Sequence, residues 1–126
     1  MGSFKDLEVF HLSVQYMKSI YQTTKTFPKE ELYGLTNQLR RAAVSIPSSI
    51  AEGSARRTAS DQRRFVDIAI GSLYESHAQL IVAGEIGYIT DGKLSKAEDF
   101  VEKLKAKLLA YRKSLTTRPP ASDVER

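Results

Sequence analysis

Arginines are the residues of this sequence whose number and spacing point most directly to chemistry. Between positions 35 and 64, six basic residues stand against two acidic ones, whereas the rest of the chain has thirteen of each. The six are Arg40, Arg41, Arg56, Arg57, Arg63 and Arg64, and the two acidic residues are Glu52 and Asp61. The whole net charge of +4 therefore comes from one window. A localised basic patch favours a polyanionic partner, although any one of these arginines is equally suited to pairing with a carboxylate at a helix interface.

The other candidate chemistry is weaker. Glu8 and His11 form one Glu-x-x-His pair, which is half of a di-iron site in a helical bundle. A second copy is missing, because the only other histidine, His77, has Tyr74 three residues before it. We therefore predict no metal site, and a surface pair near a helix start is the alternative for Glu8 and His11.

An enzyme is not predicted either. Glu75 and His77 are two residues apart, so on a helix they point to different sides and form no catalytic set with Ser72. The chain has no cysteine, and no glycine-rich phosphate loop follows a strand, because no strand pattern exists. We expect a protein without catalytic activity and without a cofactor.

A buried polar layer is a second possible use for the arginines. Glu75 is expected near the inner face of its helix, where a carboxylate is costly unless it is paired. Arg41 or Arg40 is the natural partner, and Glu52 could join them. At about 100° per residue the two neighbouring arginines cannot point the same way, so one would enter the layer and the other would face a neighbouring subunit or solvent. The alternative is that Glu75 simply points into water.

Apolar residues at helical spacing predict four helices. The first, third and fourth helices are expected at 5–27, 60–86 and 95–115. The second is expected to start just after Pro28 or near Gly34 and to end at about residue 57. Together they predict an all-α, antiparallel up-down-up-down four-helix bundle over residues 1–115, followed by a disordered tail at 116–126. Ser95 and Glu98 have the spacing of a capping box for the fourth helix, and Gly84 and Gly87 are candidate caps for the third.

Pro47 lies inside the second predicted helix. A proline there removes one backbone hydrogen bond and clashes with the preceding turn, at a cost of about 3 kcal/mol. The apolar stripe keeps its phase across the proline, so we predict a kink and not a break.

The first predicted helix has an apolar stripe wider than one buried face requires, from Val9 to Tyr21. A helix of this kind in a small domain suggests that a second subunit covers part of it, which predicts an oligomer. No apolar run approaches the length of about 20 residues that spans a membrane, and no secretion signal is evident at the start. The default expectation is a cytoplasmic protein without membrane contact.

Three segments, "FPKEELYGLTNQLRRAAVSIPSSIAEGSARR", "GSLYESHAQL" and "GEIGYI", together resemble the family of 23S ribosomal RNA intervening-sequence proteins. The resemblance extends from Phe4 to Leu115. Two positions depart from the family pattern: Ser49 stands where asparagine is expected, and His77 where leucine or a similar residue is expected.

The resemblance implies an antiparallel four-helix bundle that assembles as a ring, expected to be a homopentamer. It also brings in a related protein, the accessory variability protein of diversity-generating retroelements, which forms a basic barrel and binds nucleic acid together with a reverse transcriptase. A reverse transcriptase is therefore one candidate partner protein. The family name records a genomic location and no activity.

These considerations predict a non-enzymatic, oligomeric bundle that binds RNA or structured DNA through phosphate contacts. The residues predicted to bind are those at the turn between the second and third helices: Arg56, Arg57, Arg63 and Arg64. The rival hypothesis is an assembly or adaptor protein whose arginines form salt bridges between subunits.

Overall fold

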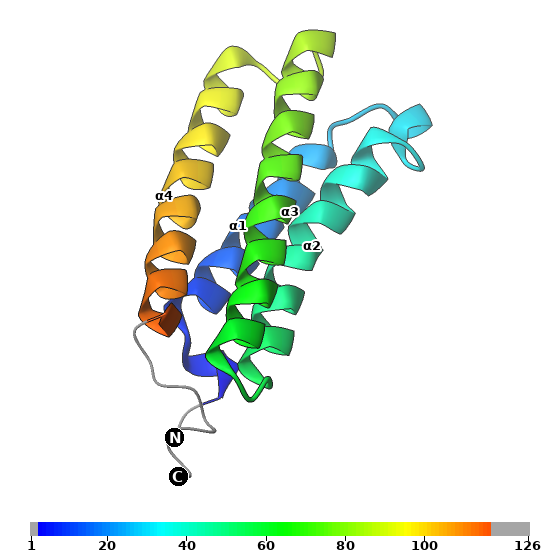
Figure 1. Ribbon diagram of the computed structural model, residues 1–126. Helices are drawn as coiled ribbons and strands as arrows, with labels where there is room; N and C mark the ends of the chain where they lie inside the picture. Colours follow the sequence, from blue (N-terminus) through cyan, green and yellow to red (C-terminus); the bar gives the residue numbers. More distant parts are fainter. Residues whose placement is uncertain (1–2, 117–126) are drawn as a thin grey trace, which may run out of the picture.

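The computed structural model describes residues 3–116, which form helices joined by short connections and contain no strand (Figure 1). The elements are the 3₁₀ turn η1 (Phe4–Asp6), α1 (Glu8–Thr24), the 3₁₀ turn η2 (Lys29–Glu31), α2 (Leu35–Ser54), α3 (Ala59–Ile86) and α4 (Asp91–Thr116). The prediction of an all-α fold with four long helices is confirmed. Of the predicted tail, only Thr116 belongs to the described residues, where it ends α4.

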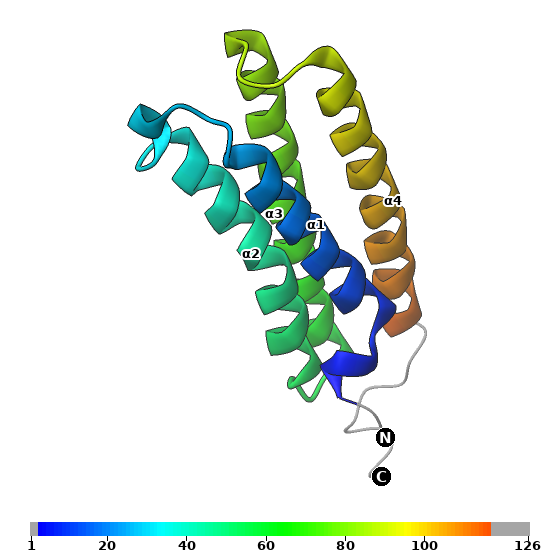
Figure 2. The ribbon, with the colours of Figure 1, turned by 180° about the vertical axis from the view of Figure 1, so that it is seen from behind.

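The four long helices pack side by side, so that α2 contacts α1 and α3, and α4 contacts α3 and α1 (Figures 1 and 2). Contacts between α3 and α4 run in opposite sequence directions. Asp67 near the start of α3 binds Arg112 near the end of α4, and His77 further along α3 binds Glu98 nearer the start of α4. The short connections, together with this order of contacts, bring the α2–α3 turn and the end of α4 to the same end of the bundle.

The core is built from the apolar stripes that the sequence shows. On α4, Val101, Leu104, Leu108 and Leu115 are fully buried, as their alternating steps of three and four predict. The other large side chains without solvent exposure are Tyr16, Ile20, Leu39, Ile46, Ile50, Val66, Leu73 and Leu80. No helix among the described residues is long and apolar enough to cross a membrane.

The wide apolar stripe of α1 is used largely inside one subunit. Val9, Tyr16 and Ile20 are buried, while Leu12 and Met17 are half-buried against the same core. Since α1 contacts both α2 and α4, its stripe has to cover two neighbours. The width therefore does not by itself require a second subunit, and the oligomer stays a prediction.

Pro47 lies inside α2, which continues through it from Leu35 to Ser54 without a break. The proline ring is buried, as are the side chains of Ile46 and Ile50 on either side of it. The missing backbone hydrogen bond is thus accompanied by apolar burial, which offsets part of its cost.

The caps of α3 and α4 show which helix ends the sequence predicted: the C-terminal glycine of α3 was predicted, and the start of α4 was not. The Thr58 hydroxyl accepts a hydrogen bond from the Asp61 amide, and Gly87 ends α3 with a positive φ of 95°. The capping box at Ser95 was wrong: α4 begins at Asp91, and the Thr90 hydroxyl accepts from the Lys93 amide at 3.2 Å. Thr90 precedes Ser95 and takes the cap position first, which leaves Glu98 to bind His77.

A carboxylate ties the α1–α2 connection to the segment that follows α3. Glu31 accepts one hydrogen bond from the Tyr88 hydroxyl at 2.7 Å and another from the Leu35 amide at 3.1 Å. The hydrogen bond from Tyr88, followed by that from Leu35, lowers the pKa of Glu31 below its usual value. The arrangement ties the start of α2 to the α3–α4 connection at the same end of the bundle.

The buried hydroxyl of Tyr16 yields a prediction about stability. It lies 2.7 Å from the hydroxyl of Ser76 on α3, and burial raises the pKa of Tyr16 to about 12, with the Ser76 bond acting in the other direction. Tyr16→Phe should lower the free energy of unfolding at pH 7 by about 1 kcal/mol, measured by urea denaturation. Tyr33→Phe is the control, because that side chain is 92% exposed and should have no effect.

The same variant should change the alkaline behaviour. In the unfolded chain this tyrosine loses its proton near pH 10.0, whereas the folded protein keeps it until about pH 12. Stability is thus lost as pH rises through this window, by up to about 1.4 kcal/mol per pH unit. Tyr16→Phe should show a shallower decline above pH 10 than the wild type. A decline of equal slope would contradict the burial of an un-ionised hydroxyl.

Candidate nucleic-acid interface

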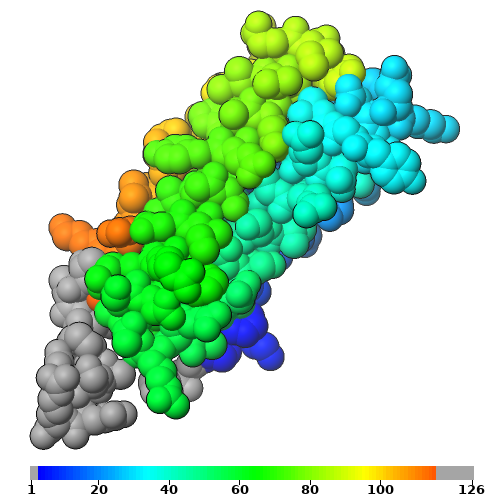
Figure 3. All heavy atoms as spheres, turned by 45° about the vertical axis from the view of Figure 1, so that its right-hand side comes forward, coloured from blue at the N-terminus to red at the C-terminus, as the bar shows by residue number. Residues whose placement is uncertain are grey.

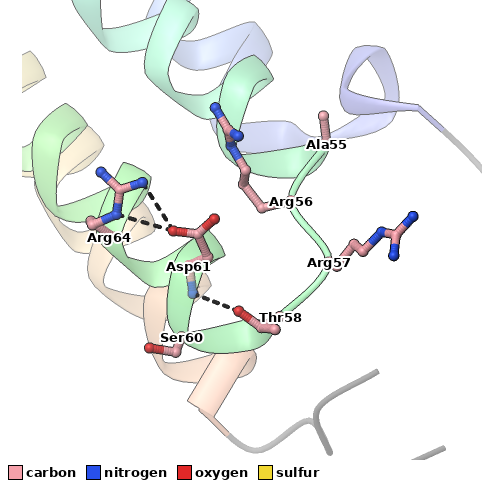
Figure 4. Close-up of a pocket in the computed structure, with 7 residues that line it drawn as sticks. All are labelled: Ala55, Arg56, Arg57, Thr58, Ser60, Asp61 and Arg64. Atoms are coloured by element: carbon pink, nitrogen blue, oxygen red, sulfur yellow. Dashed lines mark hydrogen bonds and ion pairs between the residues drawn. The ribbon is translucent and has the colours of Figure 1, made fainter. Parts of the chain in front are cut away.

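The candidate interface is the turn between α2 and α3. Here the chain leaves α2 at Ala55 and enters α3 through the cap residue Thr58. An open hollow of about 640 Å³ lies at this turn. Its lining residues, shown in Figure 4, are Ala55, Arg56, Arg57, Thr58, Ser60, Asp61 and Arg64. Three of the four predicted nucleic-acid-binding residues therefore meet at one surface feature.

Two of these arginines are held by the same aromatic ring. The guanidinium carbons of Arg56 and Arg64 each lie 4.6 Å from the centre of the Phe65 ring, which is itself buried. Cation–π contacts of this kind restrain a guanidinium group and leave its N–H donors free. Sequence reasoning missed Phe65, although its place directly after Arg64 was a visible signal.

Carboxylates add a second restraint. Arg64 binds Asp61 at 3.0 Å, and Arg56 lies 3.9 Å from Glu52. All four side chains are solvent-exposed, so these ion pairs contribute little to stability. Their effect is to orient the guanidinium groups, each of which keeps further donors for another partner.

The remaining two arginines differ from this pair. Arg57 is exposed, points away from Arg64 in Figure 4 and has no ion pair or hydrogen bond among residues 3–116. Arg63 is half-buried and does not line the hollow. The structure thus brings together Arg56, Arg57 and Arg64, and places Arg63 beside them on the first turns of α3.

The charge of the described chain is concentrated in the half of the bundle that contains this turn. Residues 3–13, 45–73 and 104–116 carry nine basic and five acidic side chains, whereas residues 14–44 and 74–103 carry eight of each. The first half has a net charge of +4 and the second is neutral. This distribution gives one end of the molecule a positive field suited to a polyanion.

The predicted polar layer of Arg40, Arg41, Glu52 and Glu75 is not formed as one unit. Glu52 lies beside Arg56 at the turn, which is remote from the other three. Arg40 turns toward α1, where its Nε donates to the Thr24 hydroxyl at 2.9 Å.

Arg40 also contacts Tyr21 of α1: the carbon of its guanidinium group lies 4.6 Å from the centre of the Tyr21 ring. Arg41 and Glu75 line the same hollow of about 260 Å³ between α2 and α3, but both are exposed and no ion pair joins them. The alternative for Glu75, a side chain facing water, is closer to what the structure shows.

Hydroxyls set the register of α2 against α3 in place of the expected charges. The side chains of Ser45 and Ser72 are hydrogen-bonded at 2.8 Å. Small residues can approach closely and satisfy each other without the desolvation cost of a buried ion pair. That is the physical reason why the charged layer was not needed.

Of the pair considered for metal binding, Glu8 and His11, Glu8 lies near a lysine, and the other histidine, His77, lies beside a carboxylate. Glu8 is 3.4 Å from Lys107, and His77 is 2.8 Å from Glu98. Within the part of the chain that the structure describes, no group of three or more histidine or acidic side chains is placed to hold a metal ion.

The four packed helices and the basic turn define the chain as an all-α, four-helix protein with a positively charged end. The family model of the 23S rRNA-intervening sequence protein matches residues 5–110. The chain therefore belongs to that family.

One similar solved structure is the crystal structure of a protein of unknown function from the S23 ribosomal protein family of Bacteroides thetaiotaomicron VPI-5482. It has a TM-score of 0.74 and 18% sequence identity, covering 83% of this chain and 98% of the other. At this identity the likeness supports the fold. No curated protein matches the chain significantly.

Gly53 provides a test of how the interface is positioned. A Cβ at this position would lie 2.8 Å from the Cβ of Phe65, which cannot move without its backbone. Gly53→Ala should therefore separate α2 from α3 at the turn and lower the free energy of unfolding by about 1–3 kcal/mol, measured by urea denaturation.

Gly92→Ala is the matched control for that substitution. A Cβ at Gly92 would meet nothing within 4 Å, so the variant should be as stable as the wild type or slightly more stable. A Gly53→Ala protein with wild-type stability would show that the close approach to Phe65 does not constrain the turn.

Proposed function

We propose that this protein is a non-enzymatic oligomer that binds RNA or structured DNA through phosphate contacts at the α2–α3 turn. Its subunits are antiparallel up-down-up-down bundles assembled as a ring, most simply a pentamer, and they act in the cytoplasm. The observation that carries the proposal is the oriented, exposed arginine cluster around Phe65 in the half of the bundle with all of the excess charge.

Phosphate recognition fits this cluster better than base recognition. Guanidinium groups form bidentate hydrogen bonds to phosphate oxygens, and these contacts do not depend on the base sequence of the nucleic acid. Phe65 is buried under the arginines and offers no free face for a base to stack on. The fully exposed Tyr33 belongs to the connection at the opposite end of α2. The proposed binding therefore reads the backbone or shape of the nucleic acid and not its sequence.

The rival proposal is an assembly or adaptor protein, with a reverse transcriptase as one candidate partner. It is favoured by the exposed apolar side chains of α3, which include Ile68 and Val82. In this case the turn arginines would bind carboxylates of another subunit. Arg56 and Arg64 already have carboxylate neighbours within their own chain, which favours the phosphate hypothesis for these two.

The test replaces all four predicted residues, Arg56, Arg57, Arg63 and Arg64, with glutamine. Binding to unrelated RNA and DNA sequences should weaken alike, as measured by fluorescence anisotropy across a salt series. For every arginine–phosphate interaction that the substitutions remove, the log–log salt slope should become shallower by about 0.7 to 0.9. The oligomeric mass should be unchanged, because these residues lie at a turn outside the core.

A charge-matched control replaces Lys18, Lys25, Lys93 and Lys96 with glutamine in the neutral half of the bundle. It removes the same net charge and should keep most of the affinity. Equal losses of affinity in the two variants would indicate a general charge effect and no site at the turn. Wild-type protein that binds no polynucleotide at low salt would refute nucleic-acid binding, and dissociation of the four-arginine variant would support the rival.

A further inference from the structure

The α2–α3 turn carries one hydroxyl group that the fold does not use. Ser60 is exposed on the first turn of α3, and its hydroxyl makes no hydrogen bond among residues 3–116. The neighbouring Thr58, by contrast, caps the helix by accepting from the Asp61 amide. The turn and the start of α3 form part of the outer surface of the molecule (Figure 3). The hydroxyl of Ser60 is therefore open to an approaching enzyme.

Arginines lie on both sides of Ser60. Arg56 and Arg57 precede it by four and three residues, and Arg63 and Arg64 follow it by three and four. On a helix, residues three and four positions apart are surface neighbours, and an acidic group placed before a basic one at this spacing is the favourable order. Arg64 also lines the same hollow as Ser60 (Figure 4). A negative group on Ser60 would thus be surrounded by guanidinium groups.

Arg64 is prepared to receive such a group. Its Nε donates to Asp61 Oδ1 at 3.0 Å, and its Nη2 lies 3.0 Å from the same oxygen, so Nη1 has no partner among the described residues. The Phe65 ring holds the guanidinium from below, with its carbon 4.6 Å from the ring centre. The start of a helix also favours negative charge in its first turn. A phosphate on Ser60 would gain from both the arginine and the helix.

The other end of the bundle offers a contrast. Ser95 is also an exposed serine near the start of a long helix, α4. Glu98 and Asp99 follow it by three and four residues, where Ser60 has arginines. A phosphate on Ser95 would meet like charge, which is unfavourable at this spacing. Exposure and position near a helix start are thus shared by the two serines, and the arginines distinguish Ser60.

We propose that Ser60 is a phosphorylation site and that its phosphate switches off nucleic-acid binding at the α2–α3 turn. The effect on binding rests on the proposed function, whereas the site itself does not. In the reaction, Ser60 Oγ forms a bond to the γ-phosphorus of a nucleoside triphosphate, and the bond from that phosphorus to the β-phosphate oxygen breaks. The hydroxyl proton passes to the catalytic carboxylate of the kinase, and the nucleoside diphosphate leaves. The kinase required is one that recognises arginines before its target serine, which Arg56 and Arg57 provide.

The charge of the phosphate explains how it would act. A phosphoserine carries a charge of about −1.5 to −2 and three strong acceptor oxygens. Bound to Arg64 and close to Arg63, it would offset two of the four positive charges at the turn. The same guanidinium groups would then be unavailable to a nucleic acid, and the added charge would repel its phosphates. Folding gains new charge-assisted bonds while binding is lost.

The first experiment identifies the modified residue. Purified protein is incubated with radiolabelled ATP and an extract of the cells that naturally produce it. Wild-type protein should take up label, Ser60→Ala should take up none, and Ser95→Ala should be labelled like the wild type. Absence of label in the wild type, or full label in Ser60→Ala, would overturn the proposal.

The second experiment measures the contact between the phosphate and Arg64 without any nucleic acid. Protein with phosphoserine incorporated at position 60 during synthesis should melt about 2–4 °C above the unmodified protein. Arg64→Gln should remove most of this gain, and phosphoserine incorporated at position 95 should give none. A melting temperature that is not raised by the phosphate at position 60, or a gain that Arg64→Gln leaves intact, would contradict the assignment.

The third experiment measures binding by fluorescence anisotropy across a salt series. For every arginine that the phosphate at position 60 withdraws from the nucleic acid, the log–log salt slope should become shallower by about 0.7 to 0.9. Phosphoserine at position 95 should leave the slope unchanged. If the wild type binds and the phosphate at position 60 does not weaken binding, the switch is refuted and the proposed function stands. If the wild type binds no polynucleotide, the proposed function and the switch fail together, while labelling and melting still decide the site.

Discussion

The close approach of α2 and α3 is the constraint on which the rest of the structure depends. These two helices share the largest contact of the bundle, and they meet through small residues. Ala43 is fully buried, Ser45 binds Ser72, and Gly53 lies where any side chain would collide with Phe65. Because the helices come together at the turn, the ring of Phe65 is brought beneath Arg56 as well as Arg64. A looser pairing would leave these arginines without a common support.

Small hydroxylated residues also occupy the centre of the bundle at low cost, between α1 and α3. Ser13 and Ser76 are fully buried, and each donates its hydroxyl to a backbone carbonyl of its own helix, at 2.8 Å in both cases. Their hydrogen bonds are therefore satisfied locally and do not depend on the neighbouring helix. Tyr16 then joins α1 to α3 through its hydrogen bond with Ser76. This bond fixes how α1 and α3 are aligned in an otherwise apolar core. A layer of buried charges in the same place would carry a much larger desolvation penalty, which its ion pairs would have to offset.

Much of the fold was predictable from periodicity, and the failures have identifiable physical causes. The four helices and the C-terminal glycine of α3 follow from local rules. The start of α4 was misplaced because Ser95 and Glu98 fit a capping box in sequence, whereas the Thr90 hydroxyl, five residues earlier, accepts from the Lys93 amide and caps the helix there. The partners of Arg40 were missed because Tyr21 and Thr24 belong to another helix, and spacing along α2 carries no information about α1. The arginine cluster could be located from the sequence, whereas its support by Phe65 depends on tertiary contact.

The arginine cluster combines weak structural bonds with fixed positions, and this combination suits a repeated binding surface. Exposed ion pairs such as Arg64 with Asp61 add little to folding, so the bundle does not depend on them for stability. They nevertheless restrict the guanidinium groups, which lowers the ordering cost when a phosphate arrives. A single turn with three arginines, two of them held in this way, would bind nucleic acid weakly at physiological salt. If every subunit of a ring presents the same turn, the contacts act together on one polyanion, and the effective concentration of the second and later turns raises the affinity without any new contact. The proposed affinity therefore depends on the proposed ring, because a turn that binds weakly on its own gains from being repeated on one polyanion.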